Sequence, residues 1–246
     1  MSETAFPKLT RPPLREALID LRLSESLPVS LVERWKKFNK EGFVNPIVMK
    51  QGGFKFEIGK DSPAQASVTS DESFGVRYER NNGAEVLQFR RNGVTLSILK
   101  NYTTWEALRT ATENAWKQFL EISGPVKISR LAVRYINVLE LPPGEDYDEY
   151  LTAGPRIPKP LPQIANGFLQ RVLVPFAKAD ALAIITQTME TTSNGSIQAV
   201  LDIDVFSECS LDGTSVEIWS RLENFRVIKN DIFFSSLTEK VLNSYR

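Results

Sequence analysis

Two aspartates on one predicted strand are the strongest candidates for chemistry in this sequence. In AVLDIDVF, residues 199–206, Asp202 and Asp204 alternate with apolar residues and therefore share one face of the strand. Two carboxylates so placed could hold Mg²⁺ or Mn²⁺, with Asp20 as a third ligand, in an enzyme that acts on phosphoesters or nucleotides. The Asp-x-Asp pattern alone is a weak signal, so we favour a polar sheet face on which both aspartates pair with arginines.

Two arginines interrupt predicted strands that are otherwise apolar. Arg22 lies in EALIDLRL, and Arg134 lies in RLAVRYINVLELP. An arginine in a buried strand needs a carboxylate partner, and buried ionic groups are normally paired, which favours a structural ion-pair network. The functional alternative is a clamp that binds an anion or a carboxylate through these guanidinium groups. The ligand-binding candidates are Arg22, Arg134, Asp20, Asp202 and Asp204.

A third candidate surface is the hairpin at residues 76–99. It carries Arg77, Arg90 and Arg91 with Tyr78 and Phe89 between them, and basic residues beside aromatic ones can bind single-stranded nucleic acid. The chain, however, has 30 basic and 30 acidic residues, so no general attraction to a polyanion is expected. We therefore favour a solvated sheet face here and do not predict nucleic acid as a partner.

The composition excludes several classes of enzyme. The chain contains no histidine and one cysteine, Cys209, so a Ser-His-Asp triad, a Cys-His pair and a structural zinc site cannot be built from it. We predict a non-catalytic binding or regulatory protein without a cofactor, whose partner is a protein or a small molecule; a homodimer is also compatible. No stretch reaches the ~18 apolar residues of a membrane helix, and MSETAFPKLTRPP lacks the apolar core of a secretory signal, so we expect a cytoplasmic protein away from membranes.

The elements that would position these residues occur in the same order twice. A strand, a short helix, a meander of strands and a long helix are predicted before residue 126, and a second such set follows from residue 127. Capping boxes at Ser30, Thr103 and Thr214 mark helix starts, and four tryptophans are predicted to pack in the core through helical stripes: Trp35, Trp105, Trp116 and Trp219. Gly52-Gly53 and Asn194-Gly195 are predicted turns, and Asp146 is the predicted start of a second short helix.

This order predicts an α+β fold, in which an antiparallel sheet carries long helices on one face. The repeated order suggests an internal duplication, and it is similar to the TATA-binding-protein-like and helix-grip folds at the level of fold alone. We predict an N-terminal half at residues 1–126 and a C-terminal half at 127–246. Because no flexible linker separates them, we expect the halves to unfold as one cooperative unit.

Several stretches resemble a known family. They are PPLREALIDLRL, RLAVRYINVLELP, YLTAGPRIP, VLDIDVF and WSRLENFRVIKNDIFFSSLTEK, which ends in IFFSSLTEK. Together they resemble a sporadically distributed family of uncharacterised prokaryotic proteins of similar length. The resemblance implies an accessory role, for example in a defence-related gene neighbourhood, and it assigns no catalytic residue.

Overall fold

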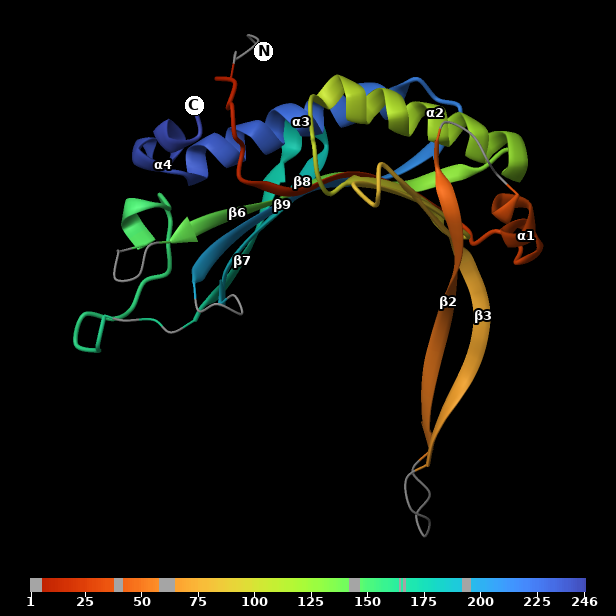
Figure 1. Cartoon of the computed structure of the whole chain (residues 1–246), viewed down its shortest axis with the longest axis horizontal. Coiled ribbons are helices and arrows are strands. Elements are labelled where there is room, and N and C mark those ends of the chain that lie inside the picture. The colour runs from red at the N-terminus through yellow and green to blue at the C-terminus, as the bar shows by residue number, and fades with distance from the viewer. Residues whose placement is uncertain are drawn as a thin grey trace. The chain divides into compact units, whose positions relative to one another are not determined.

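The described part of the chain forms a large antiparallel sheet with helices. A computed structural model describes residues 6–37, 42–57, 65–141, 147–163, 165, 167–191 and 196–246 (Figure 1). Within these residues there are nine strands in the order β2-β3-β4-β5-β1-β6-β9-β8-β7, together with four α-helices. This confirms the predicted α+β class and the antiparallel sheet.

The elements have the following bounds. The strands are β1 Leu14–Leu23, β2 Val44–Glu57, β3 Gln65–Arg80, β4 Glu85–Arg90, β5 Gly93–Ile98, β6 Lys127–Leu141, β7 Leu169–Phe176, β8 Ala181–Thr191 and β9 Ile197–Asp212. The helices are α1 Ser30–Lys36, α2 Trp105–Ser123, α3 Glu217–Ser236 and α4 Glu239–Ser244, with 3₁₀ turns η1 Tyr147–Glu149 and η2 Ala177–Ala179. No helix among the described residues is long and apolar enough to cross a membrane.

The chain divides into two compact units, which are described separately. Unit 1 comprises residues 1–19, 130–209 and 215–246, and unit 2 comprises residues 20–129 and 210–214. Both units are therefore discontinuous in sequence, whereas the predicted halves 1–126 and 127–246 are continuous. The cooperative unfolding of the halves stays a prediction.

Unit 2 is built on aromatic packing between its two helices and its sheet. Trp35 of α1 and Trp116 of α2 both stack on Phe119, with ring centroids 5.3 Å apart in each pair. Phe89 of β4 meets Phe119 edge to face at 5.4 Å, and Tyr78 meets Phe89 in the same way at 5.7 Å. All five side chains are buried, so the predicted core role of Trp35 and Trp116 is confirmed.

Strands β2 and β3 form an arm at one end of unit 2. Only residues 75–80 of β3 pair with β4, whereas β2 pairs with β3 along nearly the whole length of both strands. The outer part of the hairpin is therefore a two-stranded ribbon, and Figure 1 shows it projecting from the other strands of this unit. The predicted turn at Gly52-Gly53 is wrong: both glycines lie inside β2, opposite Asp71 and Ser70, next to a shift in register where glycine is readily accommodated.

A close backbone approach fixes the start of β5. Gly93 has φ +145°, and a Cβ atom at this position would collide with the carbonyl oxygen of Leu21 in β1. Glycine is therefore required by both the conformation and the space at this turn. The β4–β5 hairpin turns tightly here, since Arg90 pairs with Gly93.

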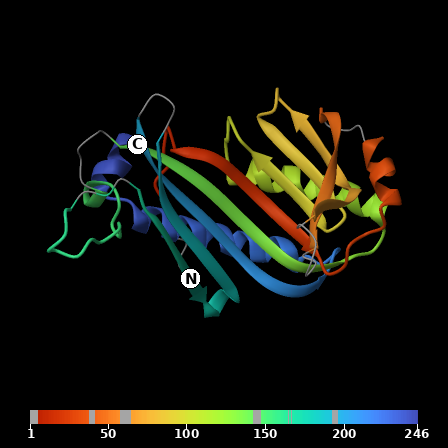
Figure 2. The same cartoon turned by 90° about the horizontal axis from the view of Figure 1, so that it is seen from below.

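Unit 1 is held together by α3, which lies along one side of its strands (Figure 2). The buried side chains of α3 recur at helical spacing, and alternate residues of β9 are buried as well. They are Ile218, Leu222, Phe225, Ile228, Ile232 and Phe233. The predicted stripe is correct except at its start, because Ile218 occupies the buried position four residues before Leu222 and leaves Trp219 half-buried.

Two further predictions in unit 1 need correction or lie outside the described residues. The short helix expected after Asp146 is a single 3₁₀ turn, Tyr147–Glu149, from which the chain enters a bridge between Leu151 and Leu237. The proposed cap Asp146 and the predicted turn Asn194-Gly195 lie outside the described residues.

Candidate functional site on the open sheet face

The side of the unit 1 sheet opposite α3 is the candidate functional surface. Asp202 and Asp204 alternate in β9 with Leu201 and Ile203, which are fully buried on the α3 side. Seen from below, the strands of unit 1 lie in front of α3, and no described helix covers their near side (Figure 2). We call this surface the open face of unit 1; it carries Arg130, Arg134, Arg171, Thr186, Asp202 and Asp204.

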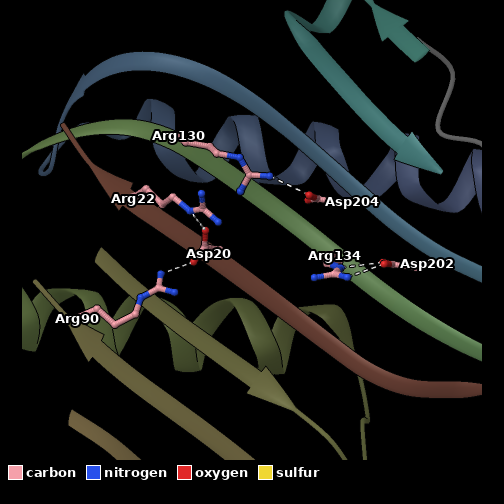
Figure 3. Close-up of polar contacts among 7 residues, drawn as sticks. All are labelled: Asp20, Arg22, Arg90, Arg130, Arg134, Asp202 and Asp204. Atoms are coloured by element: carbon pink, nitrogen blue, oxygen red, sulfur yellow. Dashed lines mark hydrogen bonds and ion pairs between the residues drawn. The ribbon is translucent and has the colours of Figure 1, made fainter. Parts of the chain in front are cut away.

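Arg134 is held on the open face by a two-point contact. Its Nε and Nη2 atoms donate to the two oxygens of Asp202 at 2.8 Å and 2.6 Å (Figure 3). The hydrogen bonds to Asp202 and the negative charges of Asp202, Asp204 and Glu16 raise the pKa of Arg134, although burial acts in the opposite direction. This paired geometry fixes the guanidinium plane, so that Arg134 is a permanently charged and oriented group.

Arg130 binds the second aspartate. Its Nη2 donates to Asp204 Oδ2 at 2.9 Å, and its guanidinium carbon lies 4.4 Å from the ring centroid of Phe206. The other oxygen of Asp204, Oδ1, is buried and has no hydrogen-bond partner among the described residues. Burial raises the pKa of Asp204, although the positive charges of Arg130 and Arg134 act in the opposite direction.

A similar cluster lies on β1 in unit 2. Asp20 is buried and accepts hydrogen bonds from Arg90 Nη2 at 2.5 Å, Thr95 Oγ1 at 2.6 Å and Arg22 Nε at 2.9 Å. Burial alone would raise the pKa of Asp20, but the charge of Arg90, the hydrogen bonds from Thr95 and Arg90 and the charge of Arg22 together lower it. Asp20 is therefore a charged centre on which three side chains converge.

In both clusters, a partly exposed arginine pairs with an aspartate that is more deeply buried. The side chain of Arg134 is 42% exposed and that of Asp202 is 17% exposed, while Arg22 is 51% exposed and Asp20 is 7% exposed. Arg22 uses only its Nε in these contacts, and Nη1 of Arg134 makes no contact with the described residues. Donor groups of both guanidinium groups thus remain available for an anionic or carbonyl oxygen from outside.

The arginines of the predicted nucleic-acid surface are engaged inside unit 2. Arg77 pairs with Glu79, Arg90 with Asp20, and Arg91 with Glu72 at 2.9 Å. The aromatic residues between them, Tyr78 and Phe89, are buried in the core and cannot stack on a base. The geometry therefore favours the structural interpretation of this hairpin.

The aspartates likewise favour ion pairing over metal binding. Asp202 and Asp204 each contact a different arginine, and no group of three or more His, Cys, Asp or Glu side chains in the described ranges is placed to hold a metal ion. A metal bound at Asp202 would have to displace the two contacts with Arg134.

Two partners in these clusters escaped the sequence analysis. Arg130 is four residues before Arg134 in the same strand and so on the same face, a spacing that could have linked it to Asp204. Thr95 gave no signal, because its contact with Asp20 depends on how β5 lies beside β1.

Hollows of about 250 Å³ and 720 Å³ lie in unit 2, and neither is lined by a predicted site residue.

Lys229 belongs to α3, on the side of the unit 1 sheet opposite the open face. Its Nζ is 3.9 Å from the ring centroid of Tyr135 and donates to Asn230 Oδ1. Burial of the amine, with a smaller effect from the charge of Arg226, lowers the pKa of Lys229 to about 7. The folded environment therefore destabilises the charged ammonium form of Lys229 relative to the neutral amine.

Replacing Lys229 by methionine is expected to raise the free energy of unfolding at about pH 7 by on the order of 2 kcal/mol. Because the folded pKa lies below the unfolded value of 10.5, the unfolded chain binds the proton more tightly, and wild-type stability rises with pH across this window. Methionine cannot titrate, so the gain should shrink towards pH 10. Urea denaturation of both proteins at the two pH values measures it, with the exposed Lys240→Met as control; a gain that does not depend on pH would contradict the expected pKa.

Two comparisons with known proteins give no match for this chain. No family model matches it. A search of curated proteins likewise found no significant match. Membership of the family that the sequence resembles therefore stays a prediction.

Proposed function

We propose that the protein is a non-catalytic binding protein that takes an acidic protein partner on the open face of unit 1. The observation that carries the proposal is the oriented guanidinium of Arg134, which Asp202 holds at two points while 42% of the side chain stays exposed. A guanidinium fixed in this way binds a carboxylate without losing much side-chain freedom, and its unused donors match carboxylate geometry.

A protein partner fits this surface better than a small molecule does. Small-molecule sites are usually concave and bury most of the ligand, whereas the open face is one side of a sheet with no described helix above it. The α3 side of the same strands is packed with buried apolar residues, among them Ile203, Leu222 and Phe225. The open face thus presents its charged groups on one side of a sheet, where a protein partner can cover them and a small molecule cannot be enclosed.

The proposal predicts that Arg134→Gln weakens binding to an acidic polymer. With poly-L-glutamate as the probe, fluorescence anisotropy should give a dissociation constant about tenfold higher than for wild type, because charge-assisted contacts are lost. Arg156→Gln is the matched control, since Arg156 is an exposed arginine in the same unit that also pairs with an aspartate, Asp148, but lies in a loop. Its affinity should equal that of the wild type.

Two outcomes would contradict the proposal. One is that wild-type protein does not bind poly-L-glutamate at low salt, where electrostatic contacts are strongest. The other is that Arg134→Gln and Arg156→Gln weaken binding equally, because that result would indicate a diffuse charge effect in place of a defined site.

The finer assignments from the sequence belong to the same proposal. In each part of the chain a strand is followed by a short helical element, α1 in the first part and the 3₁₀ turn η1 in the second, and then by further strands and a long helix. This order supports an internal duplication and a fold of the TATA-binding-protein-like or helix-grip type. We also propose an accessory role in a prokaryotic cytoplasm, which the family resemblance supports. Each of these supports a protein that acts by binding.

A further inference from the structure

Strand β7 is a terminal strand of the sheet and is unusually apolar for an exposed edge. It ends the strand order, with β8 as its only neighbour among the described strands. Leu169 is 73% exposed and Leu173 is 58% exposed, and Val172 between them is also exposed. Natural proteins usually protect such edges with charges, short strands or covering loops, so an exposed apolar edge indicates a place where another chain adds.

The unused backbone groups of this edge can be assigned from the register. The N–H of Met189 donates to the carbonyl of Phe168, and hydrogen-bonded pairs alternate along an antiparallel ladder without a shift here. The N–H and C=O groups of Leu169, Arg171 and Leu173 therefore point away from β8. Pro175 is the next residue whose backbone groups point away from β8, and it has no N–H to donate. An added strand can therefore pair fully only with Leu169, Arg171 and Leu173.

The side chains on the same edge define what the added strand should carry. The open face of β7 carries the side chains of Leu169, Arg171 and Leu173. This assignment follows from the register, because Arg171 lies opposite Thr186, which in turn lies opposite Asp202. Arg171 is exposed and makes no ion pair with any described residue. An apolar, basic, apolar row calls for an apolar, acidic, apolar row on the incoming strand.

We propose that the acidic partner adds one of its segments to β7 as an antiparallel strand, with an Asp or Glu opposite Arg171 and apolar residues opposite Leu169 and Leu173. This inference rests on the proposed function and names how the partner is held. Backbone hydrogen bonds supply affinity in such strand addition, and alternate side chains supply selectivity.

A second copy of this chain fits the edge less well. Strand β7, LQRVLVPF, contains no acidic residue, so pairing it with its own copy would give neither Arg171 a carboxylate. Pairing centred on Arg171 would also place two like charges opposite each other, which is destabilising. The edge is therefore complementary to a different sequence.

The test uses the labelled peptide Thr-Val-Thr-Glu-Thr-Val-Thr and fluorescence anisotropy. In the proposed pairing the Val and Glu amides face β7 and the Thr amides face solvent. Methylating the Val and Glu amide nitrogens should lower the affinity at least about tenfold, whereas methylating the Thr amides should leave it unchanged. The Arg171→Glu protein should not bind this peptide but should bind the variant peptide that has Lys in place of Glu. The control Lys159→Glu, which changes an exposed lysine, should bind both peptides as the wild type does.

A backbone variant of the protein gives an independent readout. Leu173→Pro removes an outward N–H without touching the ladder to β8, as Pro175 already does, so peptide binding should be lost while the fold is kept. Leu173→Ala, which keeps the N–H, should retain part of the affinity. Circular dichroism of both variants verifies the fold.

The inference is overturned if the two methylated peptides bind equally well, or if the unmodified peptide does not bind. It is also overturned if sedimentation shows a dimer that Leu173→Pro converts to monomer, because the edge would then hold a second copy. Binding of poly-L-glutamate that depends on Arg134, without binding of the peptide, would leave the proposed function standing and remove only strand addition. The peptide lies beside β7, three strands away from Arg134 in β6, so its binding should not depend on Arg134. Peptide binding together with poly-L-glutamate binding that Arg134→Gln leaves unchanged would remove the open-face site instead.

Discussion

Replacing Asp20 by alanine is expected to lower the free energy of unfolding by about 3–5 kcal/mol. The carboxylate is buried and accepts hydrogen bonds from Arg22, Arg90 and Thr95. Without it, the charge of Arg90, whose side chain is only 16% exposed, would be left buried and uncompensated. Urea denaturation at neutral pH measures the loss directly.

The partners of Asp20 offer graded controls for this result. Arg22→Ala removes an exposed partner of the same carboxylate and should cost only about 0–1 kcal/mol. Because the pKa of Asp20 is lowered in the folded state, its stabilising effect should be complete above the ordinary value of 3.8 and should decline as pH falls below it. The gap between wild type and Asp20→Ala should therefore narrow under acidic conditions, and equal costs for Asp20→Ala and Arg22→Ala would contradict the convergent cluster.

Replacing Trp116 by alanine is expected to destabilise unit 2 by about 3–5 kcal/mol. The indole is buried, stacks on Phe119 and donates from Nε1 to the carbonyl of Gly213 at 2.7 Å. Alanine would leave a large cavity and an unpaired backbone carbonyl, and both raise the free energy of the folded state. Thermal and urea denaturation, monitored by circular dichroism, should show the loss.

Two other substitutions separate the contributions at Trp116. Trp116→Phe keeps most of the apolar volume and removes the hydrogen bond to Gly213, so it should cost clearly less than alanine. Trp219→Ala, at a half-buried tryptophan of α3, should be milder than Trp116→Ala. Equal losses at the two tryptophans would show that burial is not what sets the cost.

The sequence predicted the periodic parts of this fold well, for a physical reason. Alternation in β9 and the helical stripe of α2 both arise from burial of one face, and burial leaves a regular trace in the order of apolar residues. The exact residues at which helices start were harder to predict. The cap of α2 is Thr104, which accepts from the N–H of Ala107, one residue later than the capping box at Thr103 predicts. Adjacent threonines offer the same chemistry, so the residue types alone do not decide between them.

The partners of the charged residues were harder to predict than the residues themselves. Asp20, Arg22, Asp202 and Arg134 stood out because each interrupts an apolar strand, but the pattern alone does not say which charges meet. Arg90 appeared on a different predicted surface and in fact binds Asp20, 70 positions away in the chain. Such pairings depend on strand order and register, which local sequence does not encode.

The two-stranded arm of β2 and β3 has a consequence for how this protein can change over time. Among the described residues, the ladder of the outer arm runs between β2 and β3 alone, so opening the ribbon leaves the remaining ladders of unit 2 intact. Amide hydrogens along the outer arm should then exchange with solvent by local opening, well before those of β4 and β5. A segment whose opening is independent of the core is also free to lengthen, shorten or change sequence between related proteins, and the arm is therefore where we expect this fold to diverge fastest.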